Sequence, residues 1–239
     1  MRNLLLTAAA LSLAATAATA DACKGDGPLV FAVVPAENAS GSIERFTPTA
    51  DYLAAQIGTP VTLRVASDYA AVIEGHKAGN IHIGWHGPGS FARAYQVTGG
   101  QVTPFAALVN NGVIGYYAVV YVKADSPYQT LADLKGKKFG LVDPNSTSGN
   151  FALRFFMDRD EKITPETFFS DVVFTGSHEN AVIALQQGTV DAAGNWWDNE
   201  ESSNLRQMER KGMAKYDDFR IVWKSPLLAG APLVYINSL

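Results

Sequence analysis

Three consecutive hydroxyl side chains stand out in the middle of the chain, within the stretch Asp-Pro-Asn-Ser-Thr-Ser-Gly at residues 143–149. This stretch separates an apolar run from a segment with helical apolar spacing, so it marks the turn at which a helix begins. A single hydroxyl is enough to cap a helix, and capping alone is one interpretation. The hydroxyls of Ser146, Thr147 and Ser148, with the following glycine and the free N–H groups of a helix N-terminus, predict a site for a small tetrahedral oxyanion.

A histidine occupies a second predicted junction between a strand and a helix, at Gly-Ser-His-Glu-Asn over residues 176–180. A lone histidine at such a place often caps the helix or packs in the core. Ligands of open α/β sheets, however, bind at the carboxyl ends of the strands. We therefore expect His178 to face the same cleft as the hydroxyl turn and to donate to the anion from either ring nitrogen.

Two tryptophans and an aspartate follow a short predicted strand, Val190–Ala193. Trp196 and Trp197 either pack in the core or form the wall of a pocket. In the second case Asp198 is placed to pair with a cationic group of a ligand. Asp191 is expected to bind loop backbone instead.

Two tyrosines lie at the predicted ends of elements in the first half of the chain. Tyr69 opens a helix after the capping residue Asp68, and Tyr116 begins the β-branched, tyrosine-rich stretch Tyr116–Val122. Each could be an ordinary core aromatic. Both could also offer a hydroxyl to the ligand from the side opposite the hydroxyl turn.

Enzymatic chemistry has weaker support in this sequence. Ser146 or Ser148 with His178 and Asp191 supplies the residue types of a hydrolase triad, but the G-x-S-x-G turn that exposes a nucleophilic serine is absent. The hydrolase therefore remains an alternative, and we expect the protein not to be an enzyme.

No cofactor or metal site is predicted. His82 and His86 are four residues apart, but Pro88 and the strand-like run Ile81–Gly84 argue against the helix that a paired-histidine metal site needs. The phosphate-binding pattern G-x-x-x-x-G-K-[ST] is also absent.

Short apolar runs alternate with segments of helical period, which predicts an α/β protein with mostly parallel sheets. The predicted strands are Leu29–Val34, Val61–Val65, Ile81–Gly84, Phe139–Val142, Val172–Phe174, Ile221–Trp223 and Leu233–Ile236. The predicted helices are Thr49–Ile57, Tyr69–Ala78, Ser90–Val97, Gly149–Met157, Asn180–Gln187 and Ser202–Lys211. These elements fall into two sets, with Tyr116–Val122 as the candidate crossing strand.

The chain begins with the three parts of a secretory signal, so residues 1–20 are expected to be removed on export. Residues 21–116 are predicted to form lobe 1 and residues 117–225 lobe 2. Lobe 1 would be completed by about residues 226–239 and by further C-terminal residues, because the last predicted strand has only just begun. Cys23 is the single cysteine and is expected to be an unpaired thiol.

The composition excludes several classes of protein. Of the 239 residues 47% are hydrophobic and 18% are charged, which excludes a disordered chain, and one cysteine excludes a disulfide scaffold. The net charge of −4 and the lack of a basic tract argue against nucleic acid as a partner. Any anion that the chain binds must be small and held locally.

Taken together, these residues resemble the periplasmic phosphonate-binding proteins of ABC transporters, from about residue 29 to the end. The resemblance is carried by Asp68-Tyr69, Gly115-Tyr116, the stretch 143–149, His178-Glu179, Asp191 and Trp223-Lys224-Ser225-Pro226-Leu227. It implies a type II periplasmic binding fold, in which two lobes close on a phosphonate about hinge strands. It also implies a periplasmic location and a membrane permease as the partner that recognises the closed form.

The resemblance also assigns roles to residues. Tyr69 and Tyr116 would contribute hydroxyls from the opposite lobe, and Asp198 would bind the ammonium of 2-aminoethylphosphonate. The phosphonate oxygens would be held by Ser146, Thr147, Ser148 and His178.

One position departs from the family pattern. A second carboxylate for the ammonium is expected after Lys224-Ser225-Pro226, and this sequence has Ala231 there. Losing one charge-assisted hydrogen bond costs about 1.5–3 kcal/mol, which a cation–π contact with a nearby aromatic ring could offset. A phosphite or phosphate receptor would need no such carboxylate, but Asp198 would repel a small dianion, which favours the amine.

Overall fold

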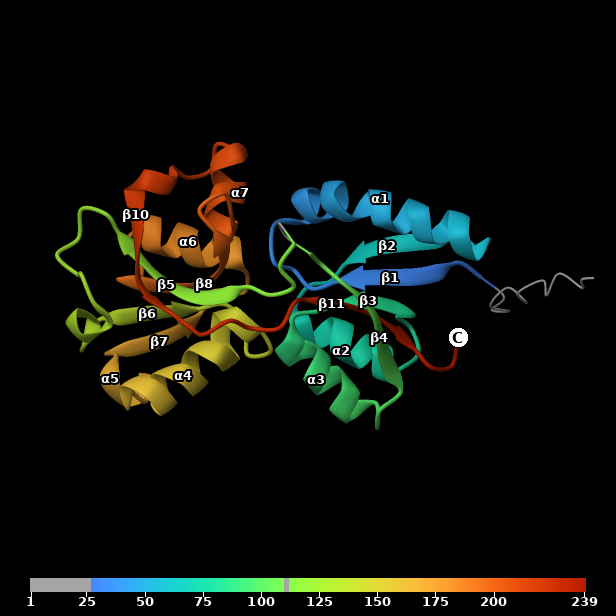
Figure 1. The fold of residues 1–239 in the computed structure, drawn as a ribbon, viewed down its shortest axis with the longest axis horizontal. Helices are drawn as coiled ribbons and strands as arrows, with labels where there is room; N and C mark the ends of the chain where they lie inside the picture. The colour runs from blue at the N-terminus through green and yellow to red at the C-terminus, as the bar shows by residue number, and fades with distance from the viewer. Residues whose placement is uncertain (1–26, 110–111) are drawn as a thin grey trace, which may run out of the picture.

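The computed structural model describes residues 27–109 and 112–239, which form two α/β lobes side by side (Figure 1). The predicted signal peptide and Cys23 lie outside these ranges. Helices cover both faces of each sheet, so the central strands are apolar throughout, as in β1 (Leu29–Val33), which is fully buried. Within the described ranges, no helix combines the length and apolar character needed to cross a bilayer. The predicted α/β class is confirmed.

Lobe 1 is built on a five-stranded sheet with the order β2-β1-β3-β11-β4. Strand β1 pairs in parallel with both of its neighbours, whereas β11 is antiparallel to both of its own. The other strands are β2 (Val61–Val65), β3 (Ile83–Trp85), β4 (Val102–Ala107) and β11 (Pro232–Ile236). The helices are α1 (Ala39–Ile57), α2 (Tyr69–Lys77) and α3 (Pro88–Val97). The last strand of the chain thus returns to the sheet of the first (Figure 1).

Lobe 2 is built on a sheet with the order β10-β5-β8-β6-β7, to which β9 adds by pairing with β8. The strands are β5 (Tyr117–Lys123), β6 (Lys138–Leu141), β7 (Asp171–Phe174), β8 (Ala192–Asn199), β9 (Ser202–Ser203) and β10 (Phe219–Lys224). The helices and helical turns are η1 (Leu131–Leu134), η2 (Thr147–Phe151), α4 (Ala152–Glu161), α5 (Pro165–Phe168), α6 (His178–Gln186), α7 (Asn204–Arg210) and η3 (Tyr216–Asp218).

The chain passes between the lobes along two adjacent segments, joined by an isolated antiparallel bridge between Tyr116 and Leu228. Tyr116 and Leu228 also exchange backbone hydrogen bonds of 3.2 and 2.8 Å. The crossing expected at Tyr116–Val122 therefore happens at its first residue only, since β5 already belongs to lobe 2. Paired crossing segments let one lobe rotate against the other without breaking either sheet.

Two predicted boundaries are wrong for identifiable reasons. The strand expected to end at Ala193 continues as β8 to Asn199, because β5 pairs with it through Trp197. Helix α1 begins at Ala39 rather than Thr49, since Asn38 caps it by accepting a hydrogen bond from Gly41 N–H at 2.9 Å. The helix tolerates an internal proline that would ordinarily mark a break.

A close backbone approach fixes the start of η2 against β6. Val142 N–H donates to the carbonyl of Gly149 at 2.9 Å. A Cβ on Gly149 would lie 2.3 Å from Val142 Cβ, so only glycine fits there. The hydroxyl turn that precedes Gly149 is thereby held against the end of the sheet.

We expect Gly149→Ala to lower the free energy of unfolding by about 1–3 kcal/mol, because the added methyl group forces the backbone apart. Urea unfolding followed by circular dichroism measures this. Gly27→Ala is the control, because a Cβ there meets no atom within 4 Å. Equal unfolding midpoints for the two variants would contradict the packing argument.

Candidate functional site

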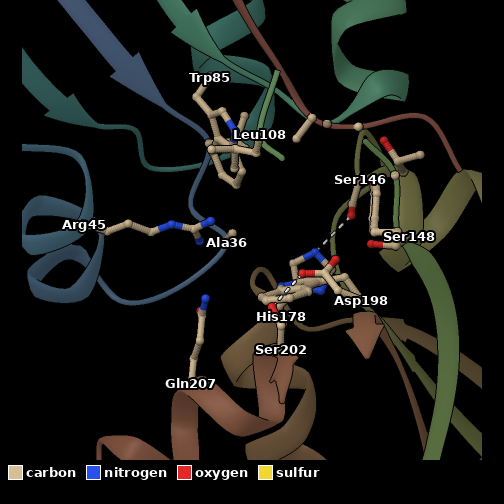
Figure 2. A pocket seen from close by; sticks show the side chains of 18 of the residues that line it. Ala36, Arg45, Trp85, Leu108, Ser146, Ser148, His178, Asp198, Ser202 and Gln207 are labelled. Carbon is tan, nitrogen blue, oxygen red and sulfur yellow. Dashed lines mark hydrogen bonds between the residues drawn. The ribbon is translucent and has the colours of Figure 1, made fainter. Parts of the chain in front are cut away.

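A cavity of about 160 Å³ lies between the two lobes, and all seven residues predicted to bind the ligand line it. They are Tyr69, Tyr116, Ser146, Thr147, Ser148, His178 and Asp198. Figure 2 shows the serines on one side of the cavity, with His178 and Asp198 beside them. Residues far apart in the sequence therefore meet at one site.

The hydroxyl turn leads from β6 into η2, and its hydroxyls have different partners. Ser146 caps the helical turn, since its Oγ accepts from Gly149 N–H at 3.1 Å. Thr147 Oγ1 accepts from Gly89 N–H of lobe 1 at 2.8 Å. Because backbone N–H groups occupy these oxygens as acceptors, the hydroxyl hydrogens remain to be donated. The capping interpretation thus holds for one hydroxyl of the three.

His178 opens α6 and is buried against the turn. Its Nε2 lies 3.4 Å from Ser146 Oγ, and its Nδ1 lies 3.0 Å from Asn195 Oδ1. Asn195 Oδ1 also accepts from Trp196 N–H, so it is an acceptor and Nδ1 carries the proton. Burial lowers the pKa of His178 to about 4, which leaves the ring neutral at pH 7.

The expectation that either nitrogen of His178 can donate to the anion is therefore wrong. Nδ1 is engaged by Asn195, and the neutral ring presents Nε2 as an acceptor. Such an acceptor suits the hydroxyl of Ser146 or the acidic proton of a singly ionised phosphorus acid.

Two tyrosines line the cavity wall as neutral phenols, Tyr69 buried and Tyr116 half-buried. Tyr69 begins α2 directly after Asp68, which caps the helix by accepting from Ala71 N–H at 2.7 Å, as predicted. Tyr116 lies at the crossing between the lobes. Burial raises the pKa of Tyr116 to about 12 and raises that of Tyr69 as well. Both phenols are thus hydrogen-bond donors at neutral pH.

The two aspartates that were assigned different roles lie in different surroundings. Asp191 Oδ2 accepts from Lys138 N–H at 2.9 Å, which confirms that it binds backbone. Asp198 lies in β8 at the cavity, where its Oδ2 accepts from Ser202 Oγ at 2.7 Å. Since His178 Nδ1 meets Asn195, the triad considered for a hydrolase is not assembled.

Several cavity residues carry no motif and were not anticipated from the sequence. Arg45 extends into the cavity from α1, and Gln207 points into it from α7 (Figure 2). Trp85, at the end of β3, also lines it. Isolated residues of common types at element surfaces give no sequence signal of this position.

Charged residues beside the cavity link the lobes. Glu179 Oε2 of α6 accepts from the Asn38 backbone N–H at 2.8 Å and from its Nδ2 at 3.0 Å. Lys211 Nζ, after α7, lies 2.5 Å from Glu37 Oε2 of lobe 1 and 2.9 Å from Glu179 Oε1. Both glutamates are buried. The contacts of Glu179 with Asn38 and of Lys211 with Glu37 cross between the lobes, so they stabilise the arrangement in which the lobes meet.

Comparison with known proteins identifies the fold and the family. Residues 31–239 match the family described as "ABC transporter, phosphonate, periplasmic substrate-binding protein". The chain belongs to this family. It has the type II periplasmic binding fold, and the resemblance stated from its motifs is confirmed.

Two curated relatives extend beyond this chain. It is 30% identical over 233 residues to the phosphonates-binding periplasmic protein of Escherichia coli, covering 95% of this chain and 66% of that protein. It is 32% identical over 243 residues to the phosphate-import protein PhnD of Mycolicibacterium smegmatis, covering 93% of this chain and 74% of that protein. The chain therefore spans about two thirds to three quarters of their lengths.

Two solved structures share the architecture. A binding-protein component of a phosphonate ABC transporter from Pseudomonas aeruginosa superposes with a TM-score of 0.79 at 28% identity, covering 90% of this chain and 70% of that one. PhnD1 from Prochlorococcus marinus, in complex with methylphosphonate, gives a TM-score of 0.73 at 18% identity, covering 87% and 76%. The second likeness bears on the fold alone.

We expect Glu179→Gln to weaken every ligand by about the same factor, near tenfold, because the carboxylate that accepts two hydrogen bonds from Asn38 across the lobes loses its charge. Titration calorimetry with ligands of different substituents measures this. Asp160→Asn is the control, since its exposed ion pair with Arg159 lies within lobe 2. Unchanged affinity in Glu179→Gln would contradict the closing role.

Proposed function

We propose that this protein is a periplasmic receptor of an ABC importer, and that its lobes close on a phosphonate. Family membership supports the phosphonate, and the hydroxyl turn facing the interlobe cavity carries the proposal. The closed form would be recognised by the membrane permease. No chemical step follows binding, which accords with the hydrolase triad not being assembled.

The phosphonate group would be held by neutral donors. Ser146, Thr147 and Ser148 would donate their hydroxyl hydrogens, and the start of η2 would add the positive end of its backbone dipole. Tyr69 and Tyr116 would donate from the opposite wall. Nε2 of His178 would accept the remaining acidic hydrogen of a singly ionised head group.

Asp198 would bind an ammonium on the ligand substituent, with 2-aminoethylphosphonate as the ligand. A carboxylate accepts up to about four hydrogen bonds, so the contact with Ser202 leaves it able to bind an ammonium. Ala231 lines the cavity where a second carboxylate would have been expected. The single carboxylate predicts weaker selection for the amine than two would give.

Phosphate and phosphite are the competing ligands, and the name of the M. smegmatis relative gives phosphate a specific basis. Either would bind at the hydroxyl turn but would bring no cation to Asp198, whose charge would repel a dianion. Calorimetry with 2-aminoethylphosphonate, ethylphosphonate, phosphite and phosphate separates these possibilities.

We expect Thr147→Ala to weaken all four ligands by about 1–3 kcal/mol, since its hydroxyl would contact the shared head group. Thr147→Ser should restore most of the affinity. Thr167→Ala, an exposed threonine of lobe 2, is the control. A loss confined to one ligand would show that Thr147 does not contact the head group.

Asp198→Asn is expected to weaken 2-aminoethylphosphonate by about tenfold to a hundredfold and to leave ethylphosphonate unchanged, because only the first carries an ammonium. Calorimetry of both ligands measures the difference. Asp171→Asn, at an exposed position in β7, is the control. Equal losses for the two ligands would mean that Asp198 supports the structure instead.

A further inference from the structure

Arg45 brings a positive charge into the cavity from the side opposite the hydroxyl turn. It lies in the first helix of lobe 1, and its side chain extends toward Ser146, Ser148 and Asp198 (Figure 2). Binding of the phosphonate head group does not require this charge, because the hydroxyl turn already supplies neutral donors. Binding of an ammonium does not require it either, because Arg45 would repel a cation.

The guanidinium of Arg45 forms a long ion pair with Glu37. Its Nη1 and Glu37 Oε1 are 3.8 Å apart, so the pair is longer than an ordinary hydrogen bond. Glu37 makes its close contact with Lys211, at 2.5 Å. Burial also lowers the pKa of Arg45, although Glu37 and Asp198 oppose this effect.

Two aromatic rings hold the guanidinium in position. Its Cζ lies 5.3 Å from the ring centre of Phe46 and 5.4 Å from that of Trp85. Such cation–π contacts restrict the side chain without using its N–H groups. Arg45 is therefore oriented in advance, with its forked donors available to a planar acceptor in the cavity.

The part of the cavity away from the hydroxyl turn thus presents charges of both signs. Asp198 of lobe 2 attracts a cation, and Arg45 of lobe 1 attracts an anion. Of the other charges close by, Lys211 is paired with Glu37 and Glu179, and Glu37 also faces Arg45 at 3.8 Å. A substituent with only an ammonium would contact Asp198 but would add nothing to the long ion pair between Arg45 and Glu37.

We infer that Arg45 binds a carboxylate on the ligand substituent, so that the preferred ligand is a short phosphonate with both an ammonium and a carboxylate. 2-Amino-3-phosphonopropionate has this chemistry. The inference rests on the proposed function, because the hydroxyl turn must first bind the phosphonate group. The carboxylate would accept two parallel hydrogen bonds from the guanidinium while the ammonium meets Asp198.

Four ligands of similar length test the inference by calorimetry. Ethylphosphonate has no charged substituent, 2-aminoethylphosphonate adds an ammonium, 3-phosphonopropionate adds a carboxylate, and 2-amino-3-phosphonopropionate has both groups. We expect the ligand with both groups to bind about tenfold to a hundredfold more tightly than 2-aminoethylphosphonate. Equal or weaker binding of the ligand with both groups would overturn the inference.

Arg45→Gln should remove that gain and leave ethylphosphonate binding unchanged, which also shows that the variant is folded. Arg45→Lys should recover only part of the gain, because an ammonium lacks the planar fork. Arg64→Gln, at an exposed position in β2, is the matched control. If Arg45→Gln weakened all four ligands equally, Arg45 would act on the head group or on packing, and the inference would be wrong.

The design separates this inference from the proposed function. If the wild-type protein bound none of the four phosphonates, the proposed function would fail. If it bound ethylphosphonate and 2-aminoethylphosphonate but gained nothing from the carboxylate, only the role of Arg45 would fail.

Discussion

Neutral donors must stabilise the phosphorus oxyanion in this account, because the turn at residues 146–148 offers hydroxyls and backbone N–H groups rather than ammonium groups. Such donors are effective when their positions are fixed before the ligand arrives and when water is scarce. Backbone N–H groups of Gly149 and Gly89 hold Ser146 and Thr147 in this way. The burial of Ser148 and His178 keeps their surroundings dry.

The order of the strands brings these groups together. Strands β6 and β7 are parallel neighbours, and each leads into a helical element at the same edge of the sheet. The hydroxyl turn follows β6 and His178 follows β7, so they meet at 3.4 Å. Lobe 1 then adds its own residues across the cleft, and the partly buried contact between Glu179 and Asn38 stabilises this arrangement of the lobes.

Local sequence signals were sufficient for the part of the site that lies at the ends of elements. The hydroxyl turn, His178 and Tyr69 each lie where a strand gives way to a helix, and capping residues mark such places. The alternation of strands and helices could be predicted because the same local signals mark where each element begins and ends. Strand β4 was missed because it is a largely exposed edge strand that contains a proline.

What the sequence could not reveal depends on pairings between distant residues. The extension of β8 follows from its pairing with β5, and no local pattern encodes that partner. Arg45 and Asp198 are 153 positions apart and lie in different lobes. Lys211 meets Glu37 across 174 positions, and only the closed fold brings the two together.

A crystal structure of the protein with bound ethylphosphonate tests the central claim most directly. The account predicts phosphonate oxygens within about 2.5–3.0 Å of the hydroxyls of Ser146, Thr147 and Ser148, with the ethyl group directed toward Arg45 and Asp198. A phosphorus atom bound elsewhere in the cleft, with these three hydroxyls turned away from it, would contradict the account.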